Sequence, residues 1–179
     1  DITVICVNNF NYGMTGGQVG PTTPHGAKAV TTQYGNFEYP FNLPYLAAAS
    51  GASFLARWTV IHARRLEWTL REAMMYPGYS FVEVIAPCST SYARWNPEGR
   101  GLDPEKLRRR GLELMKHYQK IGKVAPGTHP KDAAIKVDKQ GAIIEIIEGV
   151  FSDEPNPDFQ TAIDGQVQFA KERWQATKK

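Results

Sequence analysis

The sequence predicts an α/β fold with a largely parallel sheet and flanking helices. Three short runs of apolar and β-branched residues have the pattern of buried strands: Ile2 to Val7, Ser53 to Trp58 and Phe81 to Ala86. Stretches with helical spacing lie between them, and strands that alternate with helices favour a parallel sheet. We therefore expect these three strands to be buried and mutually parallel, with the first of them in a central position.

The chain starts abruptly, with a predicted strand that a long loop follows. Asp1 leads straight into the strand pattern, and because a domain rarely begins with a central strand and no lead-in, we expect a chain truncated at its N-terminus. From Asn8 to Pro24 the sequence is rich in glycine, asparagine, threonine and proline and predicts a long loop that continues to Pro40. Leu43 to Ser50 predicts a short helix that Gly51 ends.

A longer helix is predicted between the second and third strands. Thr59 is expected to cap its N-terminus, and Pro77 with Gly78 to end it. One face of this helix is expected to be buried, with residues at helical spacing: Leu66, Leu70, Ala73 and Met74. After the third strand, Pro87 to Gly101 predicts a second long polar loop.

The last part of the chain is expected to form an extension of the α/β core. Asp103 and Pro104 open a helix that runs to about Lys120, and Val124 to Pro130 has the composition of a linker. This divides the chain into a core over 1–125 and a C-terminal extension over 126–179. The extension is expected to hold the two strands of a hairpin and a final amphipathic helix, over 133–137, 142–150 and 157–174.

Composition excludes several classes of function. The small net charge of +3 gives no sign of a nucleic-acid partner, and the basic run from Lys106 to Arg110 is expected to be a solvated helix face. No apolar run approaches the roughly 20 residues that cross a bilayer, so no membrane partner is expected. Cys6 and Cys88 lie far apart and form no disulfide framework. A cytoplasmic, reducing location is the resulting expectation.

The first loop carries the chemistry of a hard-metal site. It leaves the carboxyl end of a strand, where open α/β sheets bind ligands. Asn9, Asn11 and Thr15 offer neutral oxygen ligands, and the glycines allow the backbone to approach a bound group closely. Magnesium prefers oxygen ligands and commonly keeps phosphates in its shell. From composition alone a turn-rich surface loop remains the competing interpretation, because Asn and Gly also form turns.

The stretch VNNFNYGMTGGQVGPTTP, residues 7–24, resembles the thiamine diphosphate motif of 2-oxoacid:ferredoxin oxidoreductase β subunits. The resemblance extends to about Asn96 and implies a thiamine-diphosphate-binding fold. It implies that Asn9 binds Mg²⁺ through its side chain and Asn11 through its main-chain carbonyl. The residues it implies for cofactor binding are Asn9, Asn11, Tyr12, Gly13, Met14 and Thr15, with Met14 nearest the substrate. Gln33 departs from the proline that the family more often has.

Cys88 has a role only by resemblance, since a lone cysteine is more often structural and a cluster needs four ligands. The segment from Ala86 to Asn96 resembles the place where this family supplies its last [4Fe–4S] ligand. The other three cysteines and a Gly-Asp-Gly element with a further Mg²⁺ ligand belong before residue 1. We expect the loop around Cys88 to be poorly anchored without them, and no catalytic residue is assigned within this chain.

The resemblance also implies an activity and partners. The activity is the oxidative decarboxylation of a 2-oxoacid to acyl-CoA and CO₂, with electrons passed to ferredoxin, and the cofactor does the hard chemistry. The partners are an α subunit that completes the site, ferredoxin, the 2-oxoacid and coenzyme A. The pattern from Cys88 to Asn96 is most similar to the 2-oxoglutarate branch, with a branched-chain 2-oxoacid as the alternative. A non-oxidative thiamine enzyme, a non-catalytic interaction subunit and a Cys/His nucleophile pair remain as rivals.

Overall fold

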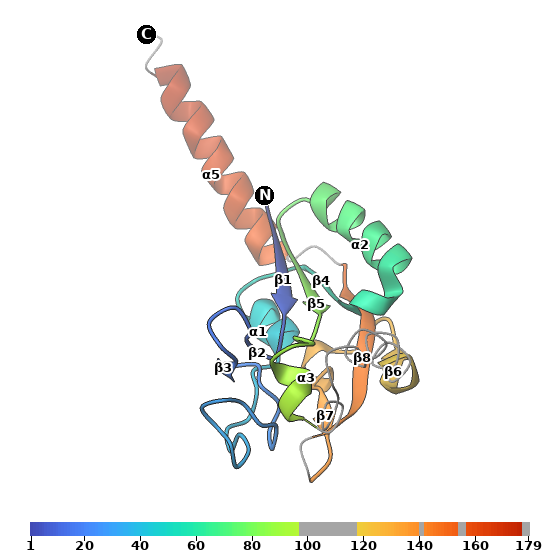
Figure 1. Cartoon of the computed structure of the whole chain (residues 1–179). Coiled ribbons are helices and arrows are strands. Elements are labelled where there is room, and N and C mark those ends of the chain that lie inside the picture. The colour runs from blue at the N-terminus through green and yellow to red at the C-terminus, as the bar shows by residue number, and fades with distance from the viewer. Residues whose placement is uncertain (97–117, 140–141, 154–156, 177–179) are drawn as a thin grey trace.

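The computed structural model describes residues 1–96, 118–139, 142–153 and 157–176 (Figure 1). Its centre is a six-stranded sheet with the order β1-β5-β4-β8-β6, in which β7 pairs with β8. The strands are β1 Ile2–Asn8, β4 Phe54–Thr59, β5 Tyr79–Ile85, β6 Gly122–Val124, β7 Lys136–Val137 and β8 Ile143–Ser152. A separate two-stranded ribbon in the first loop pairs β2, Asn11–Tyr12, with β3, Gln18–Val19.

The three strands expected from the sequence are mutually parallel, because β1 and β4 both pair with β5 in the parallel sense. The expected central position of β1 is wrong for this chain. β1 lies at the end of the sheet order, and Ile2, Ile5 and Val7 are exposed on it. β5 occupies the place between β1 and β4, and six of its seven residues are buried.

The C-terminal strands join the same sheet. β8 pairs with β4 in the antiparallel sense and with β6 in the parallel sense. The expected hairpin is confirmed, since β7 pairs antiparallel with β8. The linker over 124–130 is not a plain linker, because Val124 ends β6 and residues 130–132 form a 3₁₀ turn. The division into a core and an extension at residue 125 stays a prediction, and the sheet itself contains strands from both parts.

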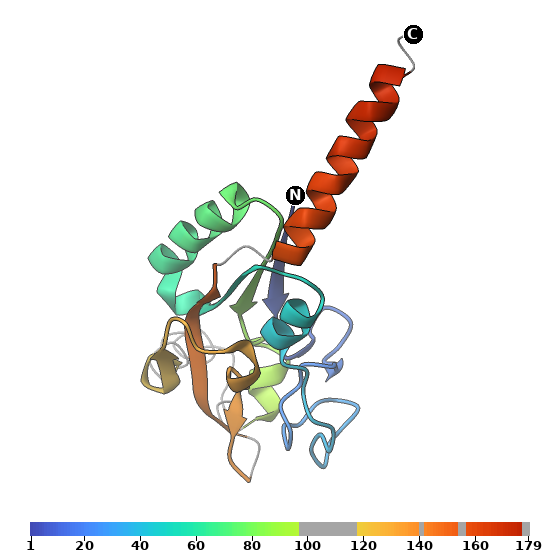
Figure 2. The same cartoon turned by 180° about the vertical axis from the view of Figure 1, so that it is seen from behind.

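Helices cover both faces of the sheet. α1, Leu43–Ala49, packs through Ala47 on a cluster that contains Leu55 and Phe81, and α2, Ala63–Met75, packs through Ala73 on the opposite-facing residues of the same strands. Successive strand residues point to opposite faces, so β4 and β5 contribute to both clusters. Figure 2, seen from behind, shows α1 in front of the sheet.

The ends of these helices follow the sequence in part. Gly51 follows α1 with φ of 91°, the left-handed conformation that suits glycine after a helix. Thr59 makes no capping hydrogen bond. Its hydroxyl donates to the buried carboxylate of Glu148 at 3.1 Å, and a 3₁₀ turn over 60–62 precedes α2. On α2, Leu66, Leu70 and Ala73 pack on the sheet as expected, whereas Met74 is exposed.

The final helix is present as α5, Pro157–Ala176. Its side chains that the structure describes, including Val167, Phe169 and Trp174, are exposed, so the expected amphipathic packing is not seen there. Most of the helix expected from Asp103 to Lys120 lies outside the described residues, and residues 118–121 are helical. Among the described helices, none is both long and apolar enough to span a bilayer.

Candidate functional site

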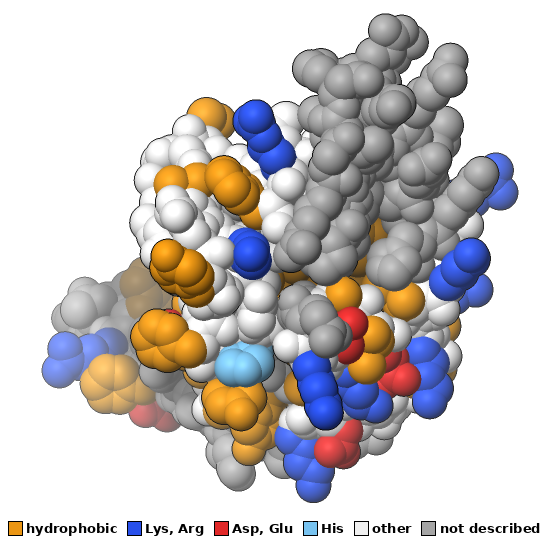
Figure 3. Space-filling model, turned by 60° about the horizontal axis from the view of Figure 1, so that its bottom comes forward, with side chains coloured by type: hydrophobic (Ala, Val, Ile, Leu, Met, Phe, Trp, Pro, Cys, Tyr) orange, Lys and Arg blue, Asp and Glu red, His pale blue; other side chains and the backbone are white. Residues whose placement is uncertain are grey.

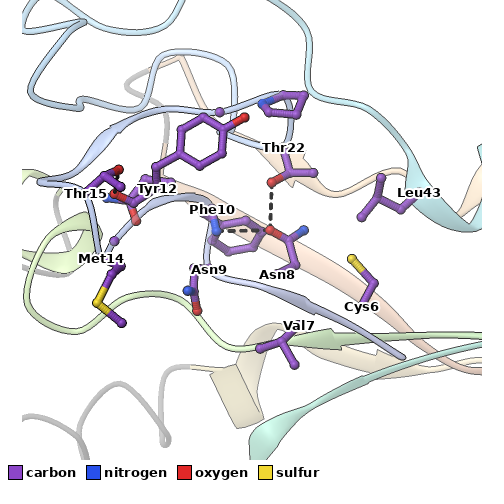
Figure 4. Close-up of a pocket in the computed structure, with 14 residues that line it drawn as sticks. Cys6, Val7, Asn8, Asn9, Phe10, Tyr12, Met14, Thr15, Thr22 and Leu43 are labelled. Atoms are coloured by element: carbon purple, nitrogen blue, oxygen red, sulfur yellow. Dashed lines mark hydrogen bonds between the residues drawn. The ribbon is translucent and has the colours of Figure 1, made fainter. Parts of the chain in front are cut away.

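A pocket of about 350 Å³ lies where β1 ends and the first loop begins (Figure 4). The six residues that the motif assigns to the cofactor all line it: Asn9, Asn11, Tyr12, Gly13, Met14 and Thr15. Cys6, Asn8, Thr22 and Leu43 complete much of its wall. The structure therefore brings the predicted site residues together at the carboxyl end of a parallel strand, where α/β sheets bind ligands.

Asn8 shapes the turn that carries this site. Its side-chain oxygen accepts hydrogen bonds from the Phe10 amide at 3.0 Å and from the Thr22 hydroxyl at 2.8 Å. Phe10 has φ of 63°, in the left-handed region that a bulky residue rarely adopts, and its side chain is fully buried against Tyr92. Figure 4 shows Asn8 turned toward Phe10 and Thr22 and Asn9 directed away from Thr22.

Asn9 and Asn11 present different atoms. The Asn9 side chain is exposed, and the main-chain carbonyl of Asn9 accepts from the Cys88 amide at 3.1 Å. The main-chain carbonyl of Asn11 accepts from the Gly13 amide at 3.0 Å. The Asn11 side chain is 8% exposed, and neither of its polar atoms has a partner among the described residues. Such a buried unpaired amide is costly and fits a site that a polar ligand completes.

The rest of the loop is held by its own hydrogen bonds. The Thr15 hydroxyl and the Gln18 side chain bond at 2.8 Å, and the Gln18 amide donates back to the Thr15 carbonyl at 2.8 Å. Gly16 and Gly17 have φ of 118° and 90°, which requires glycine. The Met14 side chain is fully exposed. Met14 is therefore accessible to a molecule that binds at the opening of the pocket.

Cys88 lies beside the same loop, because β5 ends next to β1. Besides the bond from its amide to Asn9, its carbonyl accepts from Ala93 at 3.0 Å, at the start of the short helix α3, Tyr92–Trp95. A Cβ placed on Gly13 would lie 3.0 Å from the Cys88 sulfur, so the sulfur lies against this glycine. The expectation of a poorly anchored loop is therefore wrong for residues 88–96.

The environment of Cys88 favours its thiolate. Burial raises the pKa of the thiol, but hydrogen bonds with Thr90 and Ser91 lower it by more. The resulting pKa is about 7, compared with an ordinary value of 9.0. The Ser91 amide donates to the sulfur at 3.3 Å. Burial and the nearby charge of Glu83 instead raise the pKa of Cys6. Of the two thiols, Cys88 is the one prepared to act as a ligand or a nucleophile.

A buried polar network behind the pocket was missed by the sequence analysis. Arg57 and Glu83 form an ion pair at 2.6 Å, with each side chain only 1% exposed. The second oxygen of Glu83 accepts a hydrogen bond from the Asn8 side chain at 2.7 Å. The available signal was an arginine and a glutamate inside strand runs that are otherwise apolar, because such charges are almost never fully buried unless paired.

Within the described ranges, no three His, Cys, Asp or Glu side chains are grouped so as to hold a metal ion. Asn9 and Asn11 offer oxygen atoms and Cys88 a sulfur atom, and the metal-binding roles expected for them stay predictions.

Aromatic side chains are exposed on the loop between β3 and α1: Tyr34, Phe37, Tyr39 and Phe41. Figure 3 shows hydrophobic side chains gathered on the face that comes forward when the loop end of the molecule is turned to the viewer. The Phe41 amide donates to the carbonyl of Pro21, a residue that lines the pocket, at 2.9 Å. Exposed apolar surface of this kind is typical of interaction sites.

Residues 1–84 match the family described as thiamine pyrophosphate enzyme, C-terminal TPP binding domain. Among curated relatives, the 2-oxoglutarate synthase subunit KorB of Methanothermobacter marburgensis is 35% identical over 168 residues, 94% of this chain and 53% of that protein. The KorB subunit of Methanocaldococcus jannaschii is 44% identical over 117 residues, 65% of this chain and 43% of that protein. The chain thus spans about half the length of the curated relatives it matches.

A solved structure shows the same fold. The 2-oxoglutarate:ferredoxin oxidoreductase from Magnetococcus marinus, solved with 2-oxoglutarate, coenzyme A and succinyl-CoA, superimposes with a TM-score of 0.62 at 20% identity. The match covers 93% of this chain and 52% of that chain. Together with the family match and the KorB relatives, it confirms the thiamine-diphosphate-binding fold. Over the part of their length that it spans, the chain is similar to β subunits of 2-oxoglutarate synthases and 2-oxoacid:ferredoxin oxidoreductases.

Proposed function

We propose that this chain is the cofactor-binding part of a β subunit that oxidatively decarboxylates a 2-oxoacid, with 2-oxoglutarate as the substrate. The products are an acyl-CoA and CO₂, and the electrons pass to ferredoxin. The observation that carries the proposal is that all six motif residues line one pocket in a chain similar to KorB subunits. A branched-chain 2-oxoacid is the alternative substrate.

The residues present fit thiamine diphosphate with Mg²⁺. In the proposal, the Asn9 side-chain oxygen and the Asn11 carbonyl bind Mg²⁺, an ion that prefers such hard oxygen ligands. Gly13 lets the chain approach the cofactor closely, and the exposed Met14 faces the substrate. When bound, thiamine diphosphate supplies the stabilised carbanion chemistry, while the protein binds and orients it. The pocket of about 350 Å³ and the unpaired Asn11 amide support this fit.

Cys88 is proposed as one ligand of a [4Fe–4S] cluster. Its thiol pKa of about 7 supports the role, because a thiolate is the form that binds metal. The remaining ligands would come from parts of the subunit other than the described residues. An α subunit is proposed to cover the pocket, a role that the exposed aromatic side chains support. A cytoplasmic location completes the proposal.

The test uses the full-length subunit in its complex. The wild-type complex should reduce ferredoxin with 2-oxoglutarate and coenzyme A, and more slowly with branched-chain 2-oxoacids. Asn9→Ala should lower Mg²⁺ affinity severely and leave the iron–sulfur absorbance unchanged, because it removes only an Mg²⁺ ligand. Asn11→Ala is the comparison variant: it keeps the main-chain carbonyl, so Mg²⁺ binding should largely survive, whereas the loss of its side-chain amide should weaken the binding of thiamine diphosphate.

Three results would contradict parts of this proposal. Failure of the wild-type complex to bind thiamine diphosphate would favour a non-catalytic interaction subunit. Decarboxylation without ferredoxin reduction would favour a non-oxidative thiamine enzyme. Equal loss of Mg²⁺ affinity in Asn9→Ala and Asn11→Ala would show that Asn11 contributes to Mg²⁺ binding through its side chain rather than through its main-chain carbonyl.

A further inference from the structure

Three buried polar residues connect the interior of the sheet to the pocket. Arg57 and Glu83 are register neighbours on β4 and β5. Glu83 uses one carboxylate oxygen to bind Arg57 at 2.6 Å and the other to accept from Asn8 at 2.7 Å. Asn8 is the last residue of β1, so the connection runs across three adjacent strands and ends where the first loop begins.

The Arg57 side chain is fixed at its other end. Its guanidinium also donates to the carbonyl of Ala133 and lies 3.5 Å from the side-chain oxygen of Asn42, the residue before α1. Arg57 is therefore held from two directions, and Glu83 has little freedom to move. This rigidity matters because Asn8 receives its position from Glu83.

Asn8 transmits this position to the loop. Its amide nitrogen donates to Glu83, and its amide oxygen accepts from the Phe10 amide and the Thr22 hydroxyl. These bonds hold the turn in which Phe10 has φ of 63°. Residues kept in such sparsely populated conformations persist only when their surroundings determine them. The flanking residues Asn9 and Asn11 are the proposed Mg²⁺ ligands.

Stability alone does not account for this arrangement. A buried ion pair is often no more stable than well-packed apolar residues of similar size, because both charges lose their hydration. Here each charged side chain is only 1% exposed, so that loss is nearly complete. Apolar residues in place of Arg57 and Glu83 could not accept the hydrogen bond that fixes the Asn8 side chain.

We propose that Arg57, Glu83 and Asn8 form a positioning network for the Mg²⁺ side of the pocket. The network fixes the turn at Asn8–Phe10 and thereby the direction in which Asn9 and Asn11 present their oxygens. The inference rests on the proposed function, since it takes Asn9 and Asn11 as Mg²⁺ ligands. In this proposal the three network residues are not metal ligands, and each acts through the turn.

The test exchanges the polarity of one hydrogen bond in the full-length complex. Asn8→Asp places a carboxylate against the Glu83 carboxylate, and Glu83→Gln places an amide N–H against the Asn8 amide when its oxygen stays on Arg57. Either change disrupts the bond. In the double variant Asn8→Asp/Glu83→Gln, the Gln N–H donates to the Asp oxygen, so the hydrogen bond and the net charge are both restored.

The readout is metal affinity. MgCl₂ is titrated into the metal-free complex at fixed thiamine diphosphate, and Mn²⁺ binding is followed by electron paramagnetic resonance. Each single variant should bind the metal about 10–100-fold more weakly, as is typical when a partner of a metal ligand is removed. The double variant should recover most of that affinity. Thr22→Val removes one bond to Asn8 and should give a smaller loss in a less perturbed protein.

The control for general destabilisation is Thr69→Val on α2. It removes the buried hydrogen bond from Trp58 to the Thr69 hydroxyl at 2.8 Å, away from the loop, and should leave Mg²⁺ affinity unchanged. Wild-type metal affinity in both single variants, or in Thr22→Val if the single variants do not assemble, would overturn the inference. So would a double variant no better than the single variants. If the wild-type complex binds no Mg²⁺ with thiamine diphosphate, the proposed function itself fails.

Discussion

Replacing Glu83 with glutamine should destabilise the fold strongly. The change preserves the shape of the side chain but leaves the Arg57 guanidinium, 1% exposed, without its paired carboxylate. Breaking a buried ion pair from one side costs about 3–5 kcal/mol, because the remaining charge stays buried and uncompensated. For a chain of this size, a loss of that order lowers the melting temperature by about 6–20 °C.

The chain contains a matched control for this prediction. Glu67 and Arg71 on α2 form an ion pair at 3.0 Å with exposed fractions of 66% and 72%. Glu67→Gln removes the same charge from a solvated pair of this i, i+4 type, so it should cost only about 0.3–0.5 kcal/mol. Urea denaturation of both variants, followed by circular dichroism, measures the two costs under the same conditions.

Two results would refute the reasoning. Equal losses in Glu83→Gln and Glu67→Gln would show that the buried pair contributes no more than a surface pair. A loss for Glu83→Gln that disappeared in high salt would show that solvent screens the pair, against its burial. The replacement of both charged residues by apolar ones, Arg57→Met with Glu83→Leu, should be much milder than Glu83→Gln, because no uncompensated charge remains.

Two further predictions concern the cysteines. In the chain without a cluster, iodoacetamide should alkylate Cys88 with a pH midpoint near 7, since a thiol with a pKa of about 7 is about half deprotonated at that pH. Cys6 should react much more slowly at the same pH, because burial and Glu83 raise its pKa. Equal alkylation rates of the two thiols, measured by peptide mass spectrometry, would contradict this difference in pKa. In the full-length complex, Cys88→Ser should lower the iron content and abolish ferredoxin reduction while part of the decarboxylation survives, because a hydroxyl is a poor substitute for a thiolate; unchanged iron and normal electron transfer would favour a non-oxidative enzyme.

The strands and their parallel pairing could be predicted because local pattern determines them. Runs such as 81–86 contain enough apolar and β-branched residues to indicate a buried parallel strand. The edge position of β1 could not be predicted, because an apolar run does not state how many neighbours a strand has. Thr59 shows a second limit: its sequence position suits a helix cap, but the buried Glu148 carboxylate competes for its hydroxyl. That competition depends on a residue far away in the sequence.

The candidate site could be located from its motif, but the buried network that supports its loop could not be predicted. Asn9 through Thr15 are consecutive, so one resemblance places them together, and the structure brings them to one pocket. The network of Asn8, Glu83 and Arg57 joins residues separated by 26 and 75 positions. No local pattern links them, and only the register of β1, β5 and β4 brings them into contact.

The two consecutive asparagines at the end of β1 divide the work of the site between two sides of the chain. Asn8 is the last residue of β1 and Asn9 the first residue after it, and their side chains have different surroundings. Asn8 is buried against Glu83, whereas Asn9 is exposed in the pocket. One amide therefore connects the loop to the interior of the sheet, and the other is exposed, as its proposed role in Mg²⁺ binding requires. To exchange these two roles, β1 would have to shift by one residue against β5. That shift would also move all the other side chains of β1 to the opposite face of the sheet.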